Sequence, residues 1–433
     1  MIWSPQYECI SREALVELQL ARLRETVKNV YESKGFYHQM FRSLGFQPGD
    51  LKTLEDLHRL PFTTKEDLVQ AYPYGFFIRP LREIVRIHGS SGTKGKPTIV
   101  GYTRRDLETW ADLVARVVTQ AGVGEDDIAQ ICFGYGLFTG AFGLHYGLEK
   151  VGAMVIPTSA GATERQLMLM QDFGTTALIS TPSYALHLAE VGEELGIDFK
   201  SLKLRVGLFG AEGWTEEMRK QLEERLFLKA TDNYGLSEVM GPGVAGECLE
   251  TSGMHVAEDH FLIEIIDPET GEVLPPGKKG EIVITTLTRE AMPLIRYRTK
   301  DISSISEEPC PCGRTTARLS KISGRTDDML IIRGVNVFPS QIESVLMEID
   351  GLAPHYQIVA KKRGHLDELE VLVEVSPELF TDRYRDLEAW ERKIERKLHS
   401  VLGLTAKVRL VEPKTIQRTT GKAQRVIDLR DKN

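Results

Sequence analysis

Hydrophobic positions recur along this chain with two different periods, and the two periods alternate. Between 103 and 234, apolar residues that return every three or four positions predict helices, and short runs rich in valine, isoleucine and alanine predict strands. Strict alternation of helices and strands predicts an α/β fold with a doubly wound, mostly parallel sheet. The predicted helices are 103–120, one ending at 148, 163–173, 184–195 and 215–225, and the predicted strands are 128–133, 153–156, 177–181, 204–209 and 230–234.

Other patterns precede and follow this region. Leucines and valines at helical spacing predict an amphipathic helix over 11–30, and the threonines and glutamate of 63–66 predict a capped helix start. After the last predicted strand the helical period stops. Short alternating runs at 261–266 and 281–287 then predict a small antiparallel β subdomain, at about 239–323.

A charged turn of low hydrophobicity at 324–328 marks the predicted domain boundary. A chain of 433 residues is too long for one ordinary core. We therefore expect a large N-terminal domain, 1–326, and a small mobile α+β C-terminal domain, 327–433. In the latter, helices are predicted at 340–348 and 382–401, and strands at 357–361, 368–375 and 407–411.

The charge and composition of the chain exclude several classes of binding partner. The net charge is −8 and no basic block stands out, which argues against nucleic acid or an anionic membrane surface as the main partner. No apolar run approaches the roughly 20 residues of a membrane helix, and the N-terminus lacks a signal-peptide pattern. We expect a cytoplasmic protein. Five cysteines are too few for a disulfide framework in a chain of this length.

The stretch HGSSGTKGKP, 88–97, has the composition of a phosphate-binding loop. Its glycines let successive N–H groups turn toward one anion, and its hydroxyls and lysines add donors and charge. A Walker A loop is excluded, because the spacing after the first glycine is one residue too long and Pro97 follows the last lysine. Pro97 also lacks an N–H, so we expect a hairpin between strands at 84–87 and 98–102; a flexible surface turn is the alternative. The candidate phosphate contacts are Ser90, Ser91, Gly92, Thr93, Lys94, Gly95 and Lys96.

Three predicted strand ends have an unusual content. In open α/β sheets, ligands gather beyond the carboxyl ends of the strands. GYGLFTGAFG, 134–143, alternates glycines with aromatic residues and suits a flat apolar group, although ordinary core packing is the alternative. FGAEGW, 209–214, and DNYGLSE, 232–238, each combine a glycine turn, an acidic residue and an aromatic residue, as a site for adenine and a metal-bound phosphate requires.

Five motifs, taken together and in their order, resemble the adenylate-forming superfamily of acyl-CoA synthetases, adenylation domains and luciferases. They are SSGTKGKPT, YGLSE, YRTKD, GRTDD and the terminal TTGK. The resemblance covers nearly the whole chain. Within this superfamily, five longer stretches are similar to the phenylacetate–CoA ligase branch. They are HGSSGTKGKPT, DNYGLSEVMGPG, EDHF, CPCGRT and DDMLIIRGVNVFPSQIE. The resemblance implies an AMP-forming acid–thiol ligase that uses ATP, Mg²⁺ and coenzyme A, with an acyl adenylate as the intermediate.

The resemblance also implies a role for each matched residue. The loop 90–96 holds the β- and γ-phosphates, Glu238 the Mg²⁺ and Asp301 the ribose hydroxyls. Arg325 reaches the phosphate or the ribose, and Lys422 is the catalytic cation between the acid and the α-phosphate. Two positions depart from the family pattern: Lys94 stands where threonine is usual, and Lys300 where glycine is. The nucleotide-binding turns comprise Gly210, Ala211, Glu212, Asp232, Asn233, Tyr234 and Gly235.

One C-terminal domain carries two segments that the resemblance assigns to different half-reactions. Lys422 is required at the α-phosphate, whereas Arg333 and Gly334 fall in the stretch that the resemblance places at the coenzyme A channel. Both segments cannot occupy one face of the large domain at once. We therefore expect the domain to pivot about a hinge at Asp327.

Two further sites are predicted from residue types. Tyr135, Phe138 and Phe142, with Ala211 and Pro242, are expected to build an apolar slot for the ring of an aryl acid. Two pairs of ligand-type side chains are expected to bind a structural zinc ion, and two free cysteines with a turn histidine are the alternative. These four residues are Cys248, His255, Cys310 and Cys312.

The function expected from these observations is ligation of phenylacetate to coenzyme A. A ligase for another aryl acid, such as hydroxyphenylacetate, indoleacetate or benzoate, is the alternative within the same fold. A non-catalytic nucleotide-binding module is the alternative of another class, because folds can outlive their activities. The expected partners are the acid, ATP and coenzyme A, with a homodimer as an option.

Overall fold

The computed structural model describes residues 1–90, 97–333, 335–349, 351–363, 366–376, 384–418 and 423–430. The chain forms two compact units. The first contains Met1–Ser180, Leu202–Ala211 and Lys229–Lys321, and the second contains Thr181–Ser201, Glu212–Leu228 and Ile322–Asn433. All residues from Ile322 onward thus belong to the second unit, which also includes the two earlier segments 181–201 and 212–228. The boundary at 326 and 327 stays a prediction.

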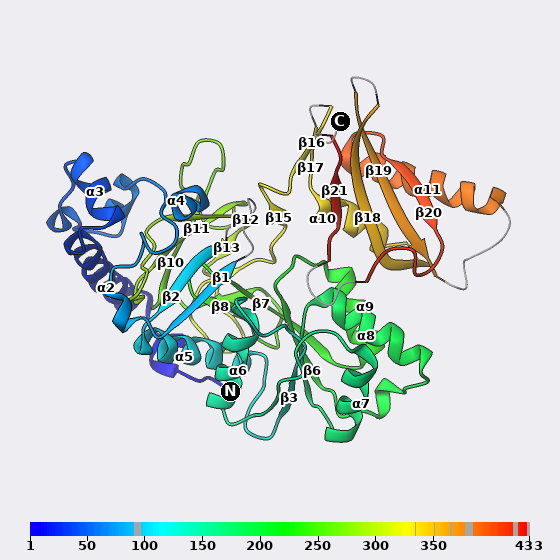
Figure 1. Ribbon diagram of the computed structural model, residues 1–433, viewed down its shortest axis with the longest axis horizontal. Coiled ribbons are helices and arrows are strands. Elements are labelled where there is room, and N and C mark those ends of the chain that lie inside the picture. The colour runs from blue at the N-terminus through cyan, green and yellow to red at the C-terminus, as the bar shows by residue number, and fades with distance from the viewer. Residues whose placement is uncertain are drawn as a thin grey trace. The chain divides into compact units, whose positions relative to one another are not determined.

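The first unit begins with helices α1 (Pro5–Glu8), α2 (Arg12–Glu32) and α3 (Phe36–Ser43), which are dark blue in Figure 1. Ser11 caps α2 by accepting a hydrogen bond from the backbone N–H of Ala14. The leucines and valines that predicted this helix form its buried face. Short 3₁₀ turns follow at Pro48–Asp50, Glu55–Arg59 and Leu81–Glu83, with α4 (Lys65–Gln70) between them, and a capping box at Thr64 and Asp67 starts α4.

Strands β1 (Arg86–Ser90) and β2 (Thr98–Tyr102) form an antiparallel pair. The predicted hairpin is therefore confirmed, with its first strand two residues later than expected. Ser90 pairs with Thr98, so the two strands run together up to the edge of the loop. Residues 91–96 lie outside the described residues.

The large sheet has the strand order β13-β14-β9-β8-β7-β6-β5-β3-β4. Its parallel half is β7-β6-β5-β3-β4, as the alternating pattern predicted. The side chains of β5 and β6 are all buried, which explains their continuous apolar sequence. The parallel strands are β3 (Ile128–Ile131), β4 (Met154–Ile156), β5 (Ala177–Ser180), β6 (Val206–Gly210) and β7 (Lys229–Leu236).

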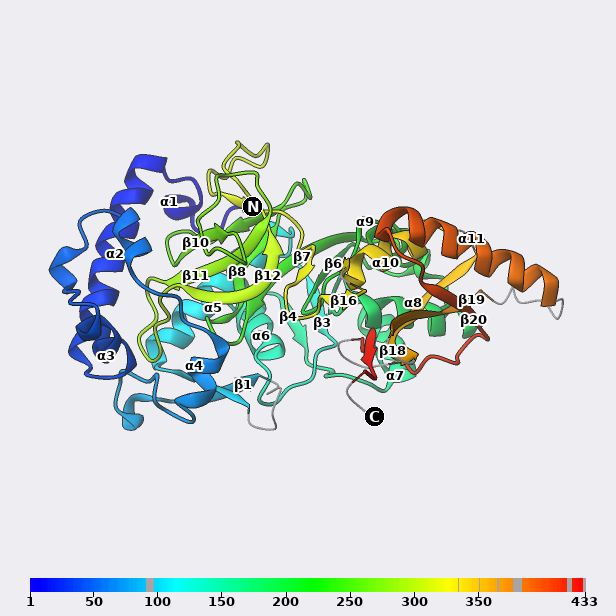
Figure 2. The ribbon, with the colours of Figure 1, turned by 90° about the horizontal axis from the view of Figure 1, so that it is seen from above.

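The strands between 239 and 323 divide between two sheets. Strands β8 (Gly241–Glu247), β9 (Met254–Val256), β13 (Ile305–Ser306) and β14 (Arg318–Leu319) extend the large sheet in antiparallel fashion. A separate antiparallel set lies side by side in Figure 2. Its strands in the first unit are β10 (Phe261–Ile266), β11 (Gly280–Thr286) and β12 (Tyr297–Ser303).

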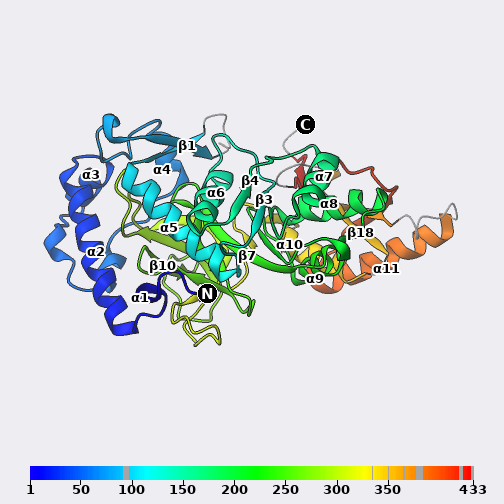
Figure 3. The same cartoon turned by 90° about the horizontal axis from the view of Figure 1, so that it is seen from below.

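Helices α5 (Arg104–Gln120), α6 (Gly140–Lys150) and α7 (Thr163–Phe173) belong to the first unit. Figure 3 shows α5 beside α6, and glycines of α6 explain the close packing. A Cβ added at Gly147 would lie 2.4 Å from Val114, and one at Gly143 would lie 2.5 Å from the Trp110 ring. Larger residues would force α6, and the aromatic loop before it, away from α5.

The second unit contains α8 (Pro182–Glu194), a short turn (Phe199–Ser201) and α9 (Glu216–Leu226), and then the C-terminal elements. After β15 (Gly324–Arg325), the hairpin β16 (Leu330–Ile332) and β17 (Val335–Val337) leads into α10 (Pro339–Met347). A mixed sheet of order β20-β19-β18-β21 follows, with α11 beside it (Figure 1). The bounds are β18 (Leu352–Arg363), β19 (Leu366–Val375), α11 (Tyr384–Leu402), β20 (Lys407–Val411) and β21 (Val426–Asp428).

The core of these C-terminal elements forms between the sheet and its helices. Ile394, Leu398 and Leu402 recur every four residues on α11, and all three are buried. They pack in one cluster with Val371 and Val373 of β19. The predicted α+β organisation is therefore present. Within the described part of the chain, no helix combines the length and apolar character needed to cross a membrane.

Candidate nucleotide and acid site

A buried carboxylate lies at the edge of the predicted phosphate loop. Ser90, the last residue of β1, donates a hydrogen bond from Oγ to Oε1 of Glu238 at 2.9 Å. Glu238 comes just after β7 and is 6% exposed. Two motifs that are 148 residues apart in sequence therefore meet. The other predicted phosphate contacts, Ser91 to Lys96, lie outside the described residues.

Tyr234 and Asp301 form a second buried pair. The Tyr234 hydroxyl, on β7, donates to Oδ2 of Asp301, on β12, at 2.7 Å. The backbone N–H of Asp301 donates to the Thr299 hydroxyl at 3.1 Å. The bond from Tyr234 orients the Asp301 carboxylate, which the family resemblance assigns to the ribose.

The turns after β6 and inside β7 approach each other closely. The Asn233 side chain donates to the Phe209 carbonyl at 2.6 Å, and a Cβ at Gly210 would lie 2.6 Å from the Asn233 carbonyl. A Cβ at Gly235 would lie only 2.0 Å from the Gly241 carbonyl, so only glycine fits there. Ala211 has a φ of 69°, which a residue with a side chain seldom adopts. This strained turn belongs to the predicted adenine site.

The aromatic stretch 134–143 runs from the loop before α6 into its first turn, and it brings two of its three predicted residues together. The Tyr135 and Phe142 rings meet edge to face with centroids 5.2 Å apart, and the Tyr135 hydroxyl lies 3.1 Å from His145 Nδ1. The Phe138 ring is more exposed and lies 6.3 Å from Phe133 instead. Pro242 accepts a hydrogen bond from Trp110 through its carbonyl. The roles of all five predicted residues in binding the acid stay predictions.

Sequence analysis assigned no role to His88, yet its ring centroid lies 5.6 Å from that of Phe142. Its Nδ1 lies 3.0 Å from the Leu137 carbonyl. Burial lowers the pKa of His88 and outweighs the effect of this bond, so the ring is neutral at neutral pH. The hydrophobic pattern of the sequence did not mark this histidine as a residue of the site. Only the fold shows that it borders the aromatic pair.

The residues predicted at the hinge and the coenzyme A channel make local contacts in the second unit. Nε and Nη2 of Arg325 donate to the two carboxylate oxygens of Asp327, at 2.8 and 3.0 Å. Arg333 donates to the Asp367 carbonyl at 2.8 Å. Gly334 and Lys422 lie outside the described residues. The hinge, channel and catalytic roles of these residues stay predictions.

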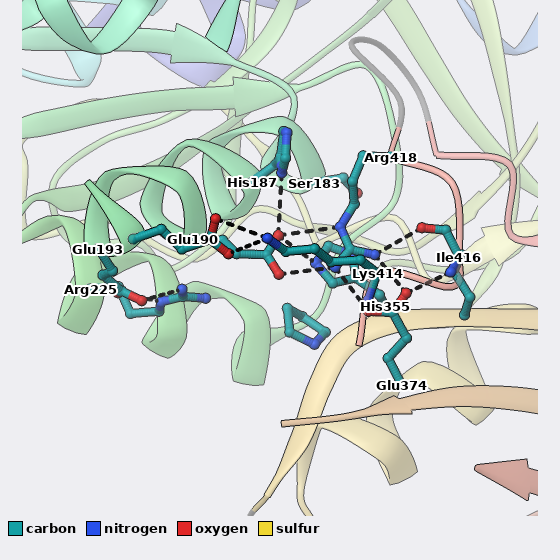
Figure 4. Close-up of polar contacts among 12 residues, drawn as sticks. Ser183, His187, Glu190, Glu193, Arg225, His355, Glu374, Lys414, Ile416 and Arg418 are labelled. Carbon is teal, nitrogen blue, oxygen red and sulfur yellow. Dashed lines mark hydrogen bonds and ion pairs between the residues drawn. The ribbon is translucent and has the colours of Figure 1, made fainter. Parts of the chain in front are cut away.

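An ion network joins α8 to the segment that precedes Lys422 (Figure 4). Arg418 binds Glu190 of α8 at 2.9 Å and Glu374 of β19 at 2.8 Å. Glu374, whose side chain is 1% exposed, also accepts from the backbone N–H groups of Lys414 and Ile416. The partly buried Arg418 side chain thus holds this segment between a helix and a strand.

The protonation states of the network follow from burial and hydrogen bonding. Burial raises the pKa of Glu190, but hydrogen bonds from His187, His355 and Arg418 more than offset this and hold the pKa below its ordinary value. Burial lowers the pKa of His355. The hydrogen bond to Glu190 raises this pKa, but by less than burial lowers it. At neutral pH, Glu190 is therefore charged and Arg418 is its main cationic partner.

The described residues beyond Lys422 are anchored as well. The backbone N–H of Ala423 donates to Oε2 of Glu212 at 3.0 Å, and Oε1 of Glu212 accepts from the N–H of Ser183 at 2.8 Å. Arg425 donates to the Ser183 hydroxyl and covers the Tyr356 ring at 4.3 Å. Both sides of 419–422 are thus fixed. Sequence analysis missed the anchor through Arg418, because Glu190 and Arg418 are 228 residues apart.

Known proteins share both the sequence and the fold of this chain. Residues 79–288 match the family described as AMP-binding enzyme, and residues 334–430 match the AMP-binding enzyme C-terminal domain. The phenylacetate–coenzyme A ligase of Aromatoleum evansii is 49% identical over 98% of this chain and 97% of its own length. That of Escherichia coli K12 is 48% identical over 98% of this chain and 97% of its own length.

A solved structure agrees with these relatives. A 2-hydroxyisobutyryl-CoA ligase, crystallised in the postadenylation state with an acyl adenylate, superposes with a TM-score of 0.92 at 31% identity. The superposition covers 98% of this chain and 91% of that one. AMP-forming acid–CoA ligases thus share its sequence over nearly the full length and share its fold. The chain therefore belongs to the phenylacetate–coenzyme A ligase family of AMP-binding enzymes.

Proposed function

We propose that phenylacetate is the acid that this enzyme joins to coenzyme A. The observation that carries the proposal is the identity of 49% and 48%, over 98% of the chain, to two ligases named for that acid. The edge-to-face pair of Tyr135 and Phe142 supports it, since such a pair suits a flat apolar ring. In the first half-reaction the carboxylate attacks the α-phosphate of ATP and releases pyrophosphate. In the second, the coenzyme A thiol attacks the acyl carbon and releases AMP.

The first half-reaction brings two anions together, so it depends on cations and N–H donors at the phosphates. Lys422 is proposed as the cation that bridges the acid and the α-phosphate. Asp301, oriented by Tyr234, is proposed to bind the ribose hydroxyls, and Gly210 and the residues of the adjoining turns are proposed to frame adenine.

Glu238 is proposed to hold Mg²⁺ beside the phosphates. The residue fits this ion, because Mg²⁺ prefers carboxylate and phosphate oxygens and Glu238 presents a buried carboxylate fixed by Ser90. When bound, the ion would neutralise phosphate charge. The chain's own part is to hold the Glu238 carboxylate at the edge of the loop.

The assay that tests the acid is acid-dependent pyrophosphate release, measured with and without coenzyme A. Phenylacetate is compared with 4-hydroxyphenylacetate, indoleacetate and benzoate. We expect kcat/KM to be highest for phenylacetate, and the product to be phenylacetyl-CoA when coenzyme A is present. A higher kcat/KM for any of the other three acids would assign the enzyme to that acid.

A double variant tests the proposed ring pocket. We expect Tyr135→Asp with Phe142→Asp to lower kcat/KM for phenylacetate by about 10²-fold or more, because an unpaired charge beside an apolar ring costs roughly 3 kcal/mol or more. Leu137→Asp is the matched control, since this residue lies in the same loop and is 58% exposed. Melting temperatures establish that each variant is folded. Normal activity of the folded double variant would place the acid elsewhere.

A homodimer is also proposed. Sedimentation equilibrium of the purified protein distinguishes a dimer from a monomer.

A further inference from the structure

Four potential metal ligands from three separate segments of the first unit converge at one point. Cys248 follows β8, His255 lies on β9, and Cys310 and Cys312 lie in the loop between β13 and β14. Their four ligand atoms all lie within 4.8 Å of one another. Cys248, His255 and Cys310 are buried, and Cys312 is partly exposed.

Two of the separations between ligand atoms are close to those of a tetrahedral site. The Sγ atoms of Cys248 and Cys310 are 3.7 Å apart, and Sγ of Cys312 is 3.3 Å from Nε2 of His255. In a tetrahedron with Zn–S of ~2.3 Å and Zn–N of ~2.0 Å, two sulfurs lie about 3.8 Å apart, and a sulfur and a nitrogen about 3.5 Å. A disulfide would require the two sulfurs to approach to about 2.05 Å. The cluster is therefore spaced for an ion between the side chains.

The surroundings orient the ligands. Nδ1 of His255 lies 3.2 Å from the Thr316 hydroxyl, which leaves Nε2 to face the sulfurs. Metal-binding histidines are held by such a contact at the other ring nitrogen. The Cys310 carbonyl accepts from the N–H of Gly313 at 3.0 Å, and Gly313 has a φ of 87°. This tight turn brings Cys310 and Cys312 to the same side although only one residue separates them.

Positive charge lies near the cluster. A site with three thiolates, one neutral histidine and Zn²⁺ has a net charge of about −1. The guanidinium groups of Arg314 and Arg318 act electrostatically on His255, and Arg318 also donates to the Ser252 carbonyl beside the cluster at 2.6 Å. Arg314 is already paired with Glu8, so Arg318 is the cation that would offset the negative charge of the occupied site.

We propose that Cys248, His255, Cys310 and Cys312 bind one zinc ion in a closed, four-coordinate structural site. The ion would tie the loop between β13 and β14 to β9 and to the end of β8. The same loop holds the start of the chain: Arg314 pairs with Glu8, and the N–H of Thr315 donates to the Glu8 carbonyl at 2.9 Å. Loss of the ion is expected to loosen this N-terminal attachment as well. The proposal does not depend on which acid the enzyme activates.

The first test measures metal in the protein itself. Tag-free protein is dialysed against EDTA, and its zinc content is measured by inductively coupled plasma mass spectrometry. We expect about one zinc per chain, released when a mercurial reagent blocks the thiols. Cys312→Ser and His255→Gln are expected to lose nearly all of this zinc. Cys132→Ser, at a buried free cysteine outside the cluster, is the matched control and is expected to keep it.

A second measurement covers the case in which the cluster variants fail to fold. Wild-type protein from cells grown with cobalt is expected to show the strong visible absorption of a tetrahedral, thiolate-bound Co²⁺ ion. Thiols are also titrated in denaturant with EDTA. If the four cluster residues bind metal, their cysteines are reduced, and the titration is expected to find all five cysteines of the chain as thiols. Washed wild-type protein without zinc or cobalt overturns the proposal. A titration that finds only three thiols would instead assign a disulfide to the cluster and would overturn it equally.

Discussion

Replacing Lys422 with alanine is expected to slow acyl adenylate formation by about 10²-fold or more, while sparing thioester formation from supplied acyl adenylate. The first half-reaction brings a carboxylate to a phosphate and so requires the proposed cation. In the second half-reaction a neutral acyl carbon is attacked, and that cation is not required. Pyrophosphate release measures the first step, and AMP release from phenylacetyl adenylate with coenzyme A measures the second.

Lys414→Ala is the matched control for this experiment. Lys414 belongs to the same C-terminal segment, but its ammonium group pairs with Glu194 at 2.8 Å and its side chain is 66% exposed. We expect both half-reactions of this variant to stay within about twofold of wild type, because exposed ion pairs contribute little. Equal slowing of both steps by Lys422→Ala would contradict a role confined to adenylation.

Asp327→Pro is expected to have the opposite effect. Proline restricts the backbone at the predicted hinge, so the domain would reorient more slowly and thioester formation would fall while pyrophosphate release stays largely intact. Asp327→Ala serves as its control, since it removes the same bonds to Arg325 without restricting the backbone. If Lys422→Ala and Asp327→Pro slowed both steps equally, a single fixed conformation would be the better explanation.

Arg418→Met is expected to lower the free energy of unfolding by about 3–5 kcal/mol, the usual cost of removing one partner from a buried ion pair. The change leaves the carboxylate of Glu374 buried with no cationic side chain from this network, and takes from Glu190 its main cation. Urea denaturation measures the loss. Adenylation is expected to fall as well, because the segment that precedes Lys422 loses its anchor.

Lys414→Met is the control for stability, because it removes an exposed ion pair to the same helix. It is expected to cost less than about 1 kcal/mol. Adding Glu374→Gln to Arg418→Met should recover part of the loss, since it removes the buried charge. An Arg418→Met protein within about 1 kcal/mol of wild type would show that the network contributes little to stability.

The effect of Arg418→Met also depends on pH. The folded-state pKa of Glu190 is lowered, so its contribution to stability is present above the ordinary pKa of glutamate and is lost as pH falls through the lower, folded-state value. The difference in stability between wild type and Arg418→Met should therefore be full at neutral pH and shrink under strongly acidic conditions. Urea denaturation at several pH values checks this.

The sequence by itself determined the local elements and the family. Helices α5, α7 and α11 and strands β3 to β7 lie where the hydrophobic period placed them, within a few residues. Ser11 and Thr64 start helices because their side chains accept hydrogen bonds from N–H groups only three residues ahead. Pro97 implied the hairpin because it lacks an N–H. Signals of this kind act within one turn or one strand, so they can be read directly from neighbouring residues.

Only the tertiary structure decided which distant groups meet. The sequence pattern of strands β8 and β9 placed them in a separate subdomain. In the structure β8 pairs with β7 and β9 pairs with β8, so both strands extend the large sheet. This pairing depends on which strand edge the fold leaves uncovered. Arg418 meets Glu190 across 228 residues, and no periodicity encodes that contact. Four ligand-type residues were visible in the sequence, but the strands and the turn that carry them bring their ligand atoms within 4.8 Å of one another. A contact between residues far apart in sequence closes a long loop of chain, and this closure depends on the packing of the whole core. Local sequence does not specify that packing.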